Sequence, residues 1–217
     1  MTNIRHHLTD AILMAYAAGT LPEAFNLVVA THVSLCDDCR AQLASFEALG
    51  GEVMAEAPAA AVLPGSLAAT MALIADPQWS PSPPRAARFR RGLFPAPLQD
   101  YVGGDLDAVN WKRFGGGVAQ AILPTASDAS VRLLRIPGGA RVPDHGHGGM
   151  ELTLVLQGAF RDDTDHFGPG DVEVADAEMT HQPIADDGPD CICLAATDAP
   201  LRFRAFIPRI AQPFLRI

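Results

Sequence analysis

The chain contains 217 residues, of which 48% are hydrophobic, and carries a net charge of −9 at pH 7. Its length favours two domains, since domains typically contain about 100–150 residues, and its acidity disfavours direct nucleic-acid binding, which relies on Lys and Arg. The N-terminus lacks a signal-peptide pattern, and no stretch reaches the roughly 18–20 apolar residues of a membrane span, so we expect a cytoplasmic protein without membrane contact.

Charge divides the chain into three parts. Residues 1–76 carry a net charge of −6, residues 77–97 carry +4 and residues 98–217 carry −7. The middle part has six prolines and no periodic apolar pattern, which is typical of a semi-extended linker. Its basic residues are interpreted as solvated linker charges: Arg85, Arg88, Arg90 and Arg91. We therefore predict one domain over residues 1–76, a linker over 77–97 and a second domain over 98–217.

The first part is predicted to be a small all-α bundle. Its apolar spacing indicates four helices, over residues 11–18, 24–32, 36–49 and 66–75. Gly19 is expected to end the first helix in a left-handed conformation, and the Gly50-Gly51 pair to end the third. Thr20 and Glu23 have the spacing of a capping box for the second helix.

Two cysteines and two histidines of this bundle have the spacing of metal ligands. His32 precedes Cys36 by four residues, and Cys36 precedes Cys39 by three, so one helix end and the next helix start can bring them together. His7 supplies the fourth ligand and His6 is a spectator, which gives the four filled positions of a structural zinc site. Ordinary buried cysteines are one alternative. A thioredoxin-like redox pair is another, although that motif requires a βαβ setting.

The run of His7, His32, Cys36 and Cys39 on short helices resembles the zinc-containing anti-sigma domain. The resemblance covers residues 1–76 and implies that these four side chains bind Zn2+. It also implies that the apolar faces of the helices hold a group IV (extracytoplasmic-function, ECF) sigma factor in a 1:1 heterodimer. The acidic charge is consistent with attraction to the basic surface that a sigma factor presents to DNA.

From Leu98 onward the hydrophobic period changes to two, which indicates strands. The clearest segments are residues 131–136, 152–156, 171–174, 191–195 and 201–206. Many short strands separated by Gly, Pro or Asp turns predict an antiparallel sandwich or barrel, with a jelly roll as the leading candidate. The whole chain is therefore predicted to be an α+β protein of two domains, an all-α bundle followed by an all-β barrel.

Three histidines and a glutamate of the second part form another candidate metal site. His145 and His147 alternate along a strand and share a face, and Glu151 follows four residues later. His181 arrives from a later strand. Three imidazoles and a carboxylate suit Zn2+ or another divalent transition metal. Surface histidines on a loop are the alternative.

The spacing of these residues between Gly139 and Gly158 resembles the first motif of the cupin family. The resemblance implies a cupin jelly-roll barrel over residues 98–217, with the four residues as metal ligands. The second cupin motif matches less well, because acidic residues replace the usual Pro and Gly, and alanine replaces a frequent Asn. The departures are at Asp176, Glu178 and Ala185. They change the turn that presents His181.

Three residues remain outside both clusters. His166 lies in an acidic turn and is interpreted as a solvated side chain. Cys191 and Cys193 alternate on a strand, so both thiols face the same way, and inert core cysteines are the favoured interpretation. A thiol pair that senses oxidation close to the metal is the alternative.

Together the two halves resemble the ChrR-type zinc-containing anti-sigma factors, in which a zinc anti-sigma domain precedes a cupin-like domain. The resemblance implies a negative transcriptional regulator that releases its sigma factor on oxidative stress of the singlet-oxygen type, sensed through the cupin-like domain. Its metal sites would be structural and sensory, and the protein would not be an enzyme. The alternatives are a cupin metalloenzyme, either a dioxygenase or an isomerase with a helical zinc-binding extension, and a structural adaptor.

Overall fold

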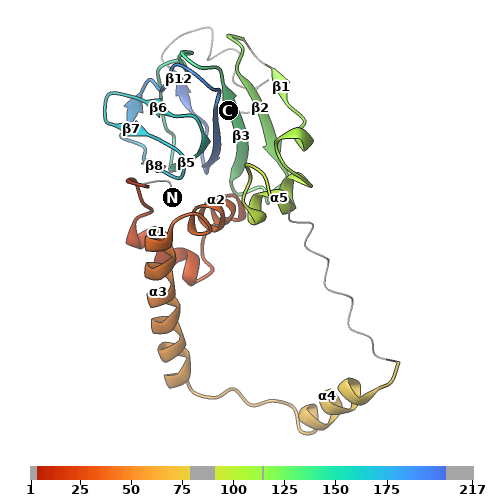
Figure 1. Cartoon of the computed structure of the whole chain (residues 1–217). Coiled ribbons are helices and arrows are strands. Elements are labelled where there is room, and N and C mark those ends of the chain that lie inside the picture. Colours follow the sequence, from red (N-terminus) through yellow and green to blue (C-terminus); the bar gives the residue numbers. More distant parts are fainter. Residues whose placement is uncertain (1–3, 79–90, 114, 204–217) are drawn as a thin grey trace.

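The structure, a computed structural model, describes residues 4–78, 91–113 and 115–203. Within them the helices are α1 (Asp10–Ala17), α2 (Glu23–Val33), α3 (Asp37–Glu56), α4 (Ser66–Ala75), α5 (Ala96–Val102) and the short η1 (Leu106–Ala108). No helix in this part of the chain is both long and apolar enough to cross a membrane. The helices α2 and α5 lie next to the sheets, α1 lies beneath α2, and α3 and α4 project away from the sheets (Figure 1).

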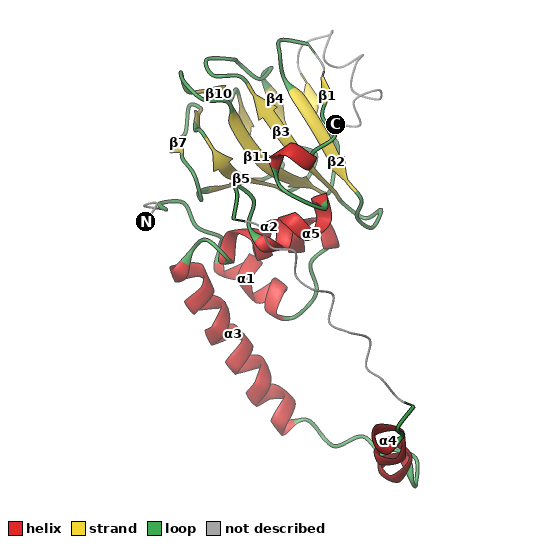
Figure 2. Cartoon of the chain, turned by 45° about the vertical axis from the view of Figure 1, so that its right-hand side comes forward, coloured by secondary structure: helices red, strands yellow, loops and turns green. Residues whose placement is uncertain are grey.

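The strands follow α5 and form antiparallel sheets (Figure 2). The large sheet has the order β1-β2-β3-β11-β5-β8, and two small sheets have the orders β10-β6-β7 and β12-β4-β9. The bounds are β1 (Lys112–Arg113), β2 (Ala119–Leu123), β3 (Ser130–Ile136), β4 (His145–Gly146), β5 (Glu151–Gln157), β6 (Phe160–Arg161), β7 (His166–Phe167), β8 (Val172–Ala175), β9 (Thr180–His181), β10 (Ile184–Ala185), β11 (Cys191–Thr197) and β12 (Arg202–Phe203). Over the described residues these are three open sheets, and their pairing closes no barrel.

Alternate residues of the large sheet enter two different cores, as the period of two requires. Leu154 of β5 and Leu194 of β11 pack in one core with the helices, whereas their immediate neighbours in the same strands, Val155 and Cys193, pack in the other. The second core also contains Phe160 and other residues of the small sheets. The polar residues of β5 and β8 that alternate with the residues packed on the helices therefore lie on the opposite face of the sheet, away from the helices.

The second helix joins the helical part to the sheet. Phe25 and Val28 of α2 are buried in the same core as Leu133, Leu154 and Leu194. Fully burying each such side chain contributes about 1.5–3 kcal/mol, so this core binds α2 tightly to the outer face of the sheet. The boundaries expected at residues 76 and 98 stay a prediction, but the two parts share apolar interior.

The linker predicted over residues 77–97 lies largely outside the described residues, which omit 79–90. The described portion differs from an extended tether. Phe94 is only 1% exposed and belongs to the shared core, and α5 begins at Ala96 after an N-cap at Pro95. Proline at such a position is compatible with a helix start, because its fixed φ and missing N–H suit the first turn.

The end of α1 follows the sequence expectation, whereas the start of α2 does not. The Thr9 hydroxyl accepts the Ile12 N–H, and Gly19 has φ 66°. The predicted capping box is wrong, because the Thr20 hydroxyl donates to the Ala15 carbonyl instead. The Glu23 carboxylate accepts hydrogen bonds from the Tyr101 hydroxyl at 2.7 Å and the Ala126 N–H at 2.8 Å. Glu23 thus ties the start of α2 to α5 and to the β2–β3 loop.

The third helix continues through the glycine pair that was expected to end it. It runs to Glu56, and Gly50 and Gly51 are both exposed. Glycine costs roughly 1 kcal/mol relative to alanine in a helix, which the surrounding Ala, Leu, Glu and Met residues offset through their favourable propensities. Beyond its last buried turn, the helix carries three exposed apolar side chains: Leu49, Val53 and Met54.

A buried aspartate joins the N-terminal residues to the turn before β8. Asp171 is 2% exposed, and its Oδ1 accepts the Arg5 N–H at 2.6 Å and the His6 N–H at 2.9 Å. Its Oδ2 accepts the Gly168 N–H at 2.8 Å. Burial favours the neutral acid, but these hydrogen bonds outweigh it and lower the pKa of Asp171.

Replacing Asp171 by Asn should destabilise the fold by about 1–3 kcal/mol at pH 7, because charge-assisted bonds to three N–H groups are weakened. The lowered folded-state pKa means that the contribution is present above the ordinary aspartate value and lost as pH falls through the folded-state value. Urea unfolding at several pH values should therefore show that the variant and the native protein differ less in free energy of unfolding at acid pH than at pH 7. Asp163→Asn, an exposed change in the nearby turn, should have little effect. A difference independent of pH would contradict this account.

Candidate metal centres

The structure brings together the four residues predicted as zinc ligands: His7, His32, Cys36 and Cys39. One ligand atom of each lies within 4.8 Å of all the others. His7 precedes α1, His32 lies in the last turn of α2, Cys36 is the N-cap of α3 and Cys39 lies in its first turn. The site therefore depends on the packing of three helix ends. We call this set the N-terminal cluster.

The distances in the N-terminal cluster suit one shared ion. The Nδ1 atom of His7 lies 3.3 Å from the Cys36 sulfur and 3.7 Å from the Cys39 sulfur. In a tetrahedral zinc site, bonds of about 2.05 Å to nitrogen and about 2.3 Å to sulfur place these atoms about 3.6 Å apart. Burial raises the pKa of the Cys39 thiol to about 11, so the cysteine stays protonated unless a cation favours its thiolate.

Within the described part of the chain, His32 has a buried nitrogen without a hydrogen-bond partner. Its Nδ1 lies 3.0 Å from the Gly170 carbonyl oxygen, and because a carbonyl only accepts, Nδ1 carries the proton. The lone pair is then on Nε2, the buried nitrogen without such a partner. Burial lowers the pKa of His32 to about 4, so the imidazole is neutral at pH 7. A metal ion would satisfy this nitrogen, and the carbonyl on the opposite side of the ring orients it.

His6, expected to be a spectator, lies outside the N-terminal cluster and makes other contacts. Its Nε2 is 3.0 Å from Asp165 Oδ2, and its Nδ1 is 3.4 Å from Asp171 Oδ2. Its ring packs against Phe167, with a centroid separation of 4.4 Å. His6 therefore joins the segment before α1 to the turn that contains β7.

The three histidines of the second predicted site also converge. His145 of β4 pairs directly with His181 of β9, and the Nε2 atoms of His147 and His181 lie 3.3 Å apart. Two imidazole nitrogens on one tetrahedral ion are about 3.4 Å apart. Burial lowers the pKa values of His145 and His147 to about 4, so both are neutral at pH 7, as a metal ligand must be. We call these three residues the histidine cluster.

Glu151, the predicted fourth ligand, lies beside this cluster. Its Oε2 is 3.7 Å from His147 Nδ1, and its Oε1 accepts the Thr153 hydroxyl at 3.2 Å. It is not among the side chains whose ligand atoms lie mutually within 4.8 Å. Burial raises the pKa of Glu151 to about 7. A bound cation would favour its charged form, so the group fits the role of a nearby anionic ligand.

The sequence reasoning missed two carboxylates behind His181. Asp162 Oδ2 lies 2.8 Å and Glu173 Oε1 lies 3.0 Å from His181 Nδ1. Burial disfavours the charged imidazole, but these two groups outweigh it and raise the pKa of His181 to about 9. A carboxylate on Nδ1 directs Nε2 toward the other histidines, as in many metal sites. The available signal was Glu173 itself, an acid at an inward position between Val172 and Val174 of a buried strand.

The remaining candidates have simpler surroundings. His166 is not merely solvated, because its Nε2 lies 2.7 Å from Asp186 Oδ2. The sulfur atoms of Cys191 and Cys193 are buried 3.5 Å apart. The Cys191 hydrogen bond and burial raise the pKa of the Cys193 thiol far above its ordinary value, which disfavours its reactive thiolate.

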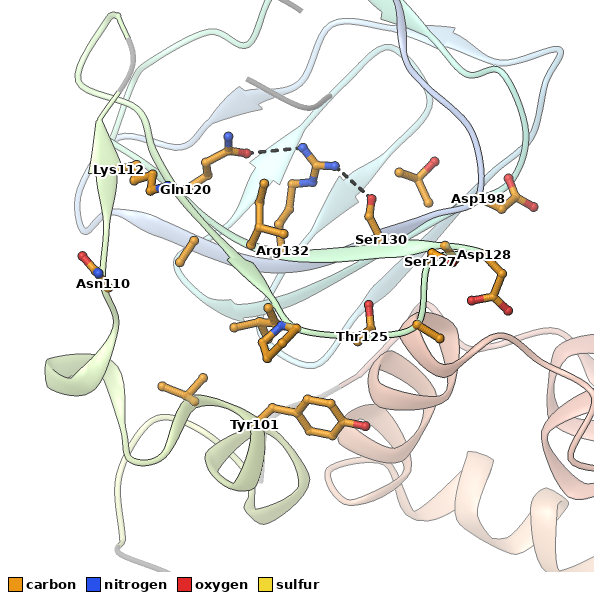
Figure 3. Close-up of a pocket in the computed structure, with 18 of the residues that line it drawn as sticks. Tyr101, Asn110, Lys112, Gln120, Thr125, Ser127, Asp128, Ser130, Arg132 and Asp198 are labelled. Atoms are coloured by element: carbon orange, nitrogen blue, oxygen red, sulfur yellow. Dashed lines mark hydrogen bonds between the residues drawn. The ribbon is translucent and has the colours of Figure 1, made fainter. Parts of the chain in front are cut away.

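A groove of about 1370 Å³ runs along β2 and β3 near α5. The buried Arg132 donates to Gln120 at 3.3 Å and to Ser130 at 3.0 Å along its wall (Figure 3). Burial lowers the pKa of this guanidinium. The groove shares no lining residue with the N-terminal cluster or the histidine cluster, so it is a separate polar surface.

Replacing Cys36 by Ser should remove the metal dependence of stability. Free Zn2+ at about 1,000 times its dissociation constant should stabilise the native chain by about 4 kcal/mol, because the folded state alone brings the ligands together. The variant should lose most of this increment in urea unfolding with and without a chelator. Cys191→Ser is the matched control and should keep it. An equal increment in both variants would contradict the assignment.

Three comparisons with known proteins agree. Residues 99–199 match the protein family described as the ChrR Cupin-like domain. Over 214 residues, 99% of each chain, the sequence is 61% identical to Anti-sigma-E factor ChrR of Cereibacter sphaeroides. The structure is similar, with a TM-score of 0.80, to a chain in the crystal structure of Rhodobacter sphaeroides SigE in complex with the anti-sigma ChrR. That match has 58% identity and covers 90% of this chain and 100% of the other.

Proposed function

The chain belongs to the ChrR family of anti-sigma factors, and from this membership we propose that it binds an ECF (group IV) sigma factor in a 1:1 complex in the cytoplasm. It is a regulatory binding protein rather than a cupin enzyme. Its C-terminal part has a cupin-like fold, which follows a set of N-terminal helices along the chain. The observation that carries the proposal is the 61% sequence identity to an anti-sigma factor, which extends over 99% of both chains.

We assign sigma-factor binding to residues 1–76 and sensing to residues 98–217, joined by residues 77–97. The three sheets are then the walls of one jelly-roll barrel. The N-terminal cluster holds Zn2+ as a structural ion, because its four ligands leave no open position. The histidine cluster with Glu151 holds Zn2+ or another divalent transition metal, for which three imidazoles and a carboxylate are suited.

An uncovered apolar surface supports the binding role. Helix α4 has no buried residue, and it lies apart from the rest of the protein (Figure 1). The exposed apolar side chains of α3, α4 and the segment between them are Leu49, Val53, Met54, Val62, Leu63, Leu67, Met71, Leu73 and Ile74. Large apolar side chains exposed in such number over consecutive segments indicate an interaction site. Residues 41–78 carry four acids and no Lys or Arg, which complements a basic partner.

Changing Leu67 and Met71 together to Asp should weaken sigma-factor binding at least about tenfold, equivalent to about 1.4 kcal/mol, because two apolar anchors become charged. Both side chains are exposed, so folding and metal content should be unchanged. Calorimetric titration with the purified sigma factor measures the effect. The same change at Ile122, an exposed apolar residue of β2, should leave the affinity as it is. Unaltered binding by the double variant would argue against this surface.

Release of the sigma factor is assigned to oxidative stress of the singlet-oxygen type, received in the cupin-like part. Its imidazoles are buried beside the core that contains the Cys191 and Cys193 thiols, and both imidazoles and thiols are oxidisable. Helix α2 connects this part to the binding part, because it packs on the sheet and carries His32 in its last turn. A useful signal must change the coupling by a few kcal/mol.

Replacing His147 by Ala should leave the sigma factor bound but abolish induction, because the binding surface is intact and the sensing metal is lost. A reporter gene under the sigma factor's promoter, exposed to a photosensitiser and light, measures induction. Co-purification measures binding. Parallel variants at His145, Glu151 and His181 should behave alike. Loss of sigma-factor binding in all four variants would defeat the division of labour.

A further inference from the structure

One segment of the cupin-like part touches ligands of both metal centres. The bridging segment, residues 162–173, contains β7 and the turn that leads into β8. Each of its ends contacts the imidazole of His181, and its middle contacts the residues around His7 and His32. The contacting residues are not all adjacent to one another, but they belong to a single run of twelve residues.

At the histidine cluster the contacts are two carboxylates on one nitrogen. Asp162, the first residue of the segment, and Glu173, its last, lie 2.8 Å and 3.0 Å from His181 Nδ1. Asp162 is held in turn by Thr164, which donates to it through both its N–H and its hydroxyl. A change in the position of His181 therefore acts on both ends of the segment.

At the N-terminal cluster the contacts reach one ligand directly and the neighbour of another. The Gly170 carbonyl oxygen lies 3.0 Å from His32 Nδ1. Asp165 and Asp171 hold the ring of His6, the residue next to His7, and the Val172 N–H donates to the His6 carbonyl at 3.2 Å. The backbone just before His7 and the ring of His32 are thus tied to the bridging segment.

The turn at Gly170 leaves little room for independent movement. Gly170 has φ 93°, and a Cβ at this position would lie 2.6 Å from Ile4 Cδ1. Any other residue would strain the left-handed backbone and collide with the N-terminal segment. The close approach means that a shift of this turn moves Ile4 and the chain leading to His7 with it.

We propose that the bridging segment couples the two metal centres, so that metal bound at the histidine cluster raises the metal affinity of the N-terminal cluster. Metal at the histidine cluster fixes His181, which fixes Asp162 and Glu173 and thereby the Gly170 carbonyl that orients His32. Coupling is reciprocal, so each metal strengthens the binding of the other by the same factor. The inference rests on the proposed function only in taking both clusters as metal sites.

The coupling is measurable in the full chain without a sigma factor. Co2+ is the probe, because only the N-terminal cluster has thiolate ligands and gives a thiolate-to-cobalt charge-transfer band. The band should disappear in Cys36→Ser, which assigns it. Titration in competition with a chelator then gives the affinity of this cluster with the histidine cluster intact and after His147→Ala. We expect the affinity to fall about 5–150-fold in the variant, the range of typical coupling energies. Structural sites bind metal so tightly that the N-terminal cluster keeps its ion after a loss of this size. The sigma factor therefore stays bound.

The bridging contacts are tested by repeating the comparison in other backgrounds. In the His6→Ala and Asp171→Asn backgrounds we compare the Co2+ affinity of the N-terminal cluster with His147 present and after His147→Ala. The ratio of these two affinities should fall toward one. In Asp163→Asn, an exposed change inside the same segment, it should equal the native ratio. Glu151→Gln replaces His147→Ala if the latter misfolds by circular dichroism. A native ratio of one, or a ratio unchanged by His6→Ala and Asp171→Asn, overturns the proposal. Either result leaves sigma-factor binding untouched.

Discussion

The packing of α2 on the large sheet is the constraint on which the rest of the structure depends. Phe25 and Val28 are buried in one core with Leu154 and Leu194, and this packing fixes the position of the C-terminal end of α2 relative to the sheet. His32 lies in that last turn, and the N-terminal cluster forms only where the end of α2 meets the start of α3. Hydrophobic burial is non-directional, so the polar contacts of Glu23 and Asp171 set the orientation of the helix on the sheet.

Each candidate metal centre contains a ring that the protein orients through one of its nitrogens. An imidazole nitrogen buried without a hydrogen-bond partner is costly, and among the described residues His32 Nε2 is in that position. The opposite nitrogen of His32 is held by a backbone carbonyl, whereas that of His181 is held by two carboxylates. A neutral oxygen and two acidic groups tune their rings differently, which is consistent with one structural and one responsive site.

Much of the fold follows from local pattern. The alternation that predicted strands over residues 131–136, 152–156 and 191–195 reappears in β3, β5 and β11, because a period of two places one set of side chains in each core. The four predicted helices are also present. The errors arose where distant residues compete with local signals. Glu23 has capping-box spacing, yet its carboxylate binds Tyr101 and Ala126, which lie more than seventy residues further along the chain.

The candidate sites were predictable to the extent that ligand spacing is local. Cys36 and Cys39 are three residues apart on one helix turn, and His145 and His147 share one face of a strand. Asp162 and Glu173 were missed because neither has a motif spacing to His181, and only the fold brings them to its Nδ1. The contacts of His6 were missed for the same reason, since they cross from the first residues of the chain to Asp165 and Asp171.

The isolation of α4 has a consequence for the strength of the complex. A helix of ten residues without tertiary support is marginally stable in water, because its nucleation cost is repaid only over longer segments. Part of the energy gained on docking is then spent in ordering this helix, which lowers affinity for a given contact area. Partners joined in this way dissociate more readily than rigid ones, so a modest loosening elsewhere in the molecule suffices to tip the balance toward the free transcription factor.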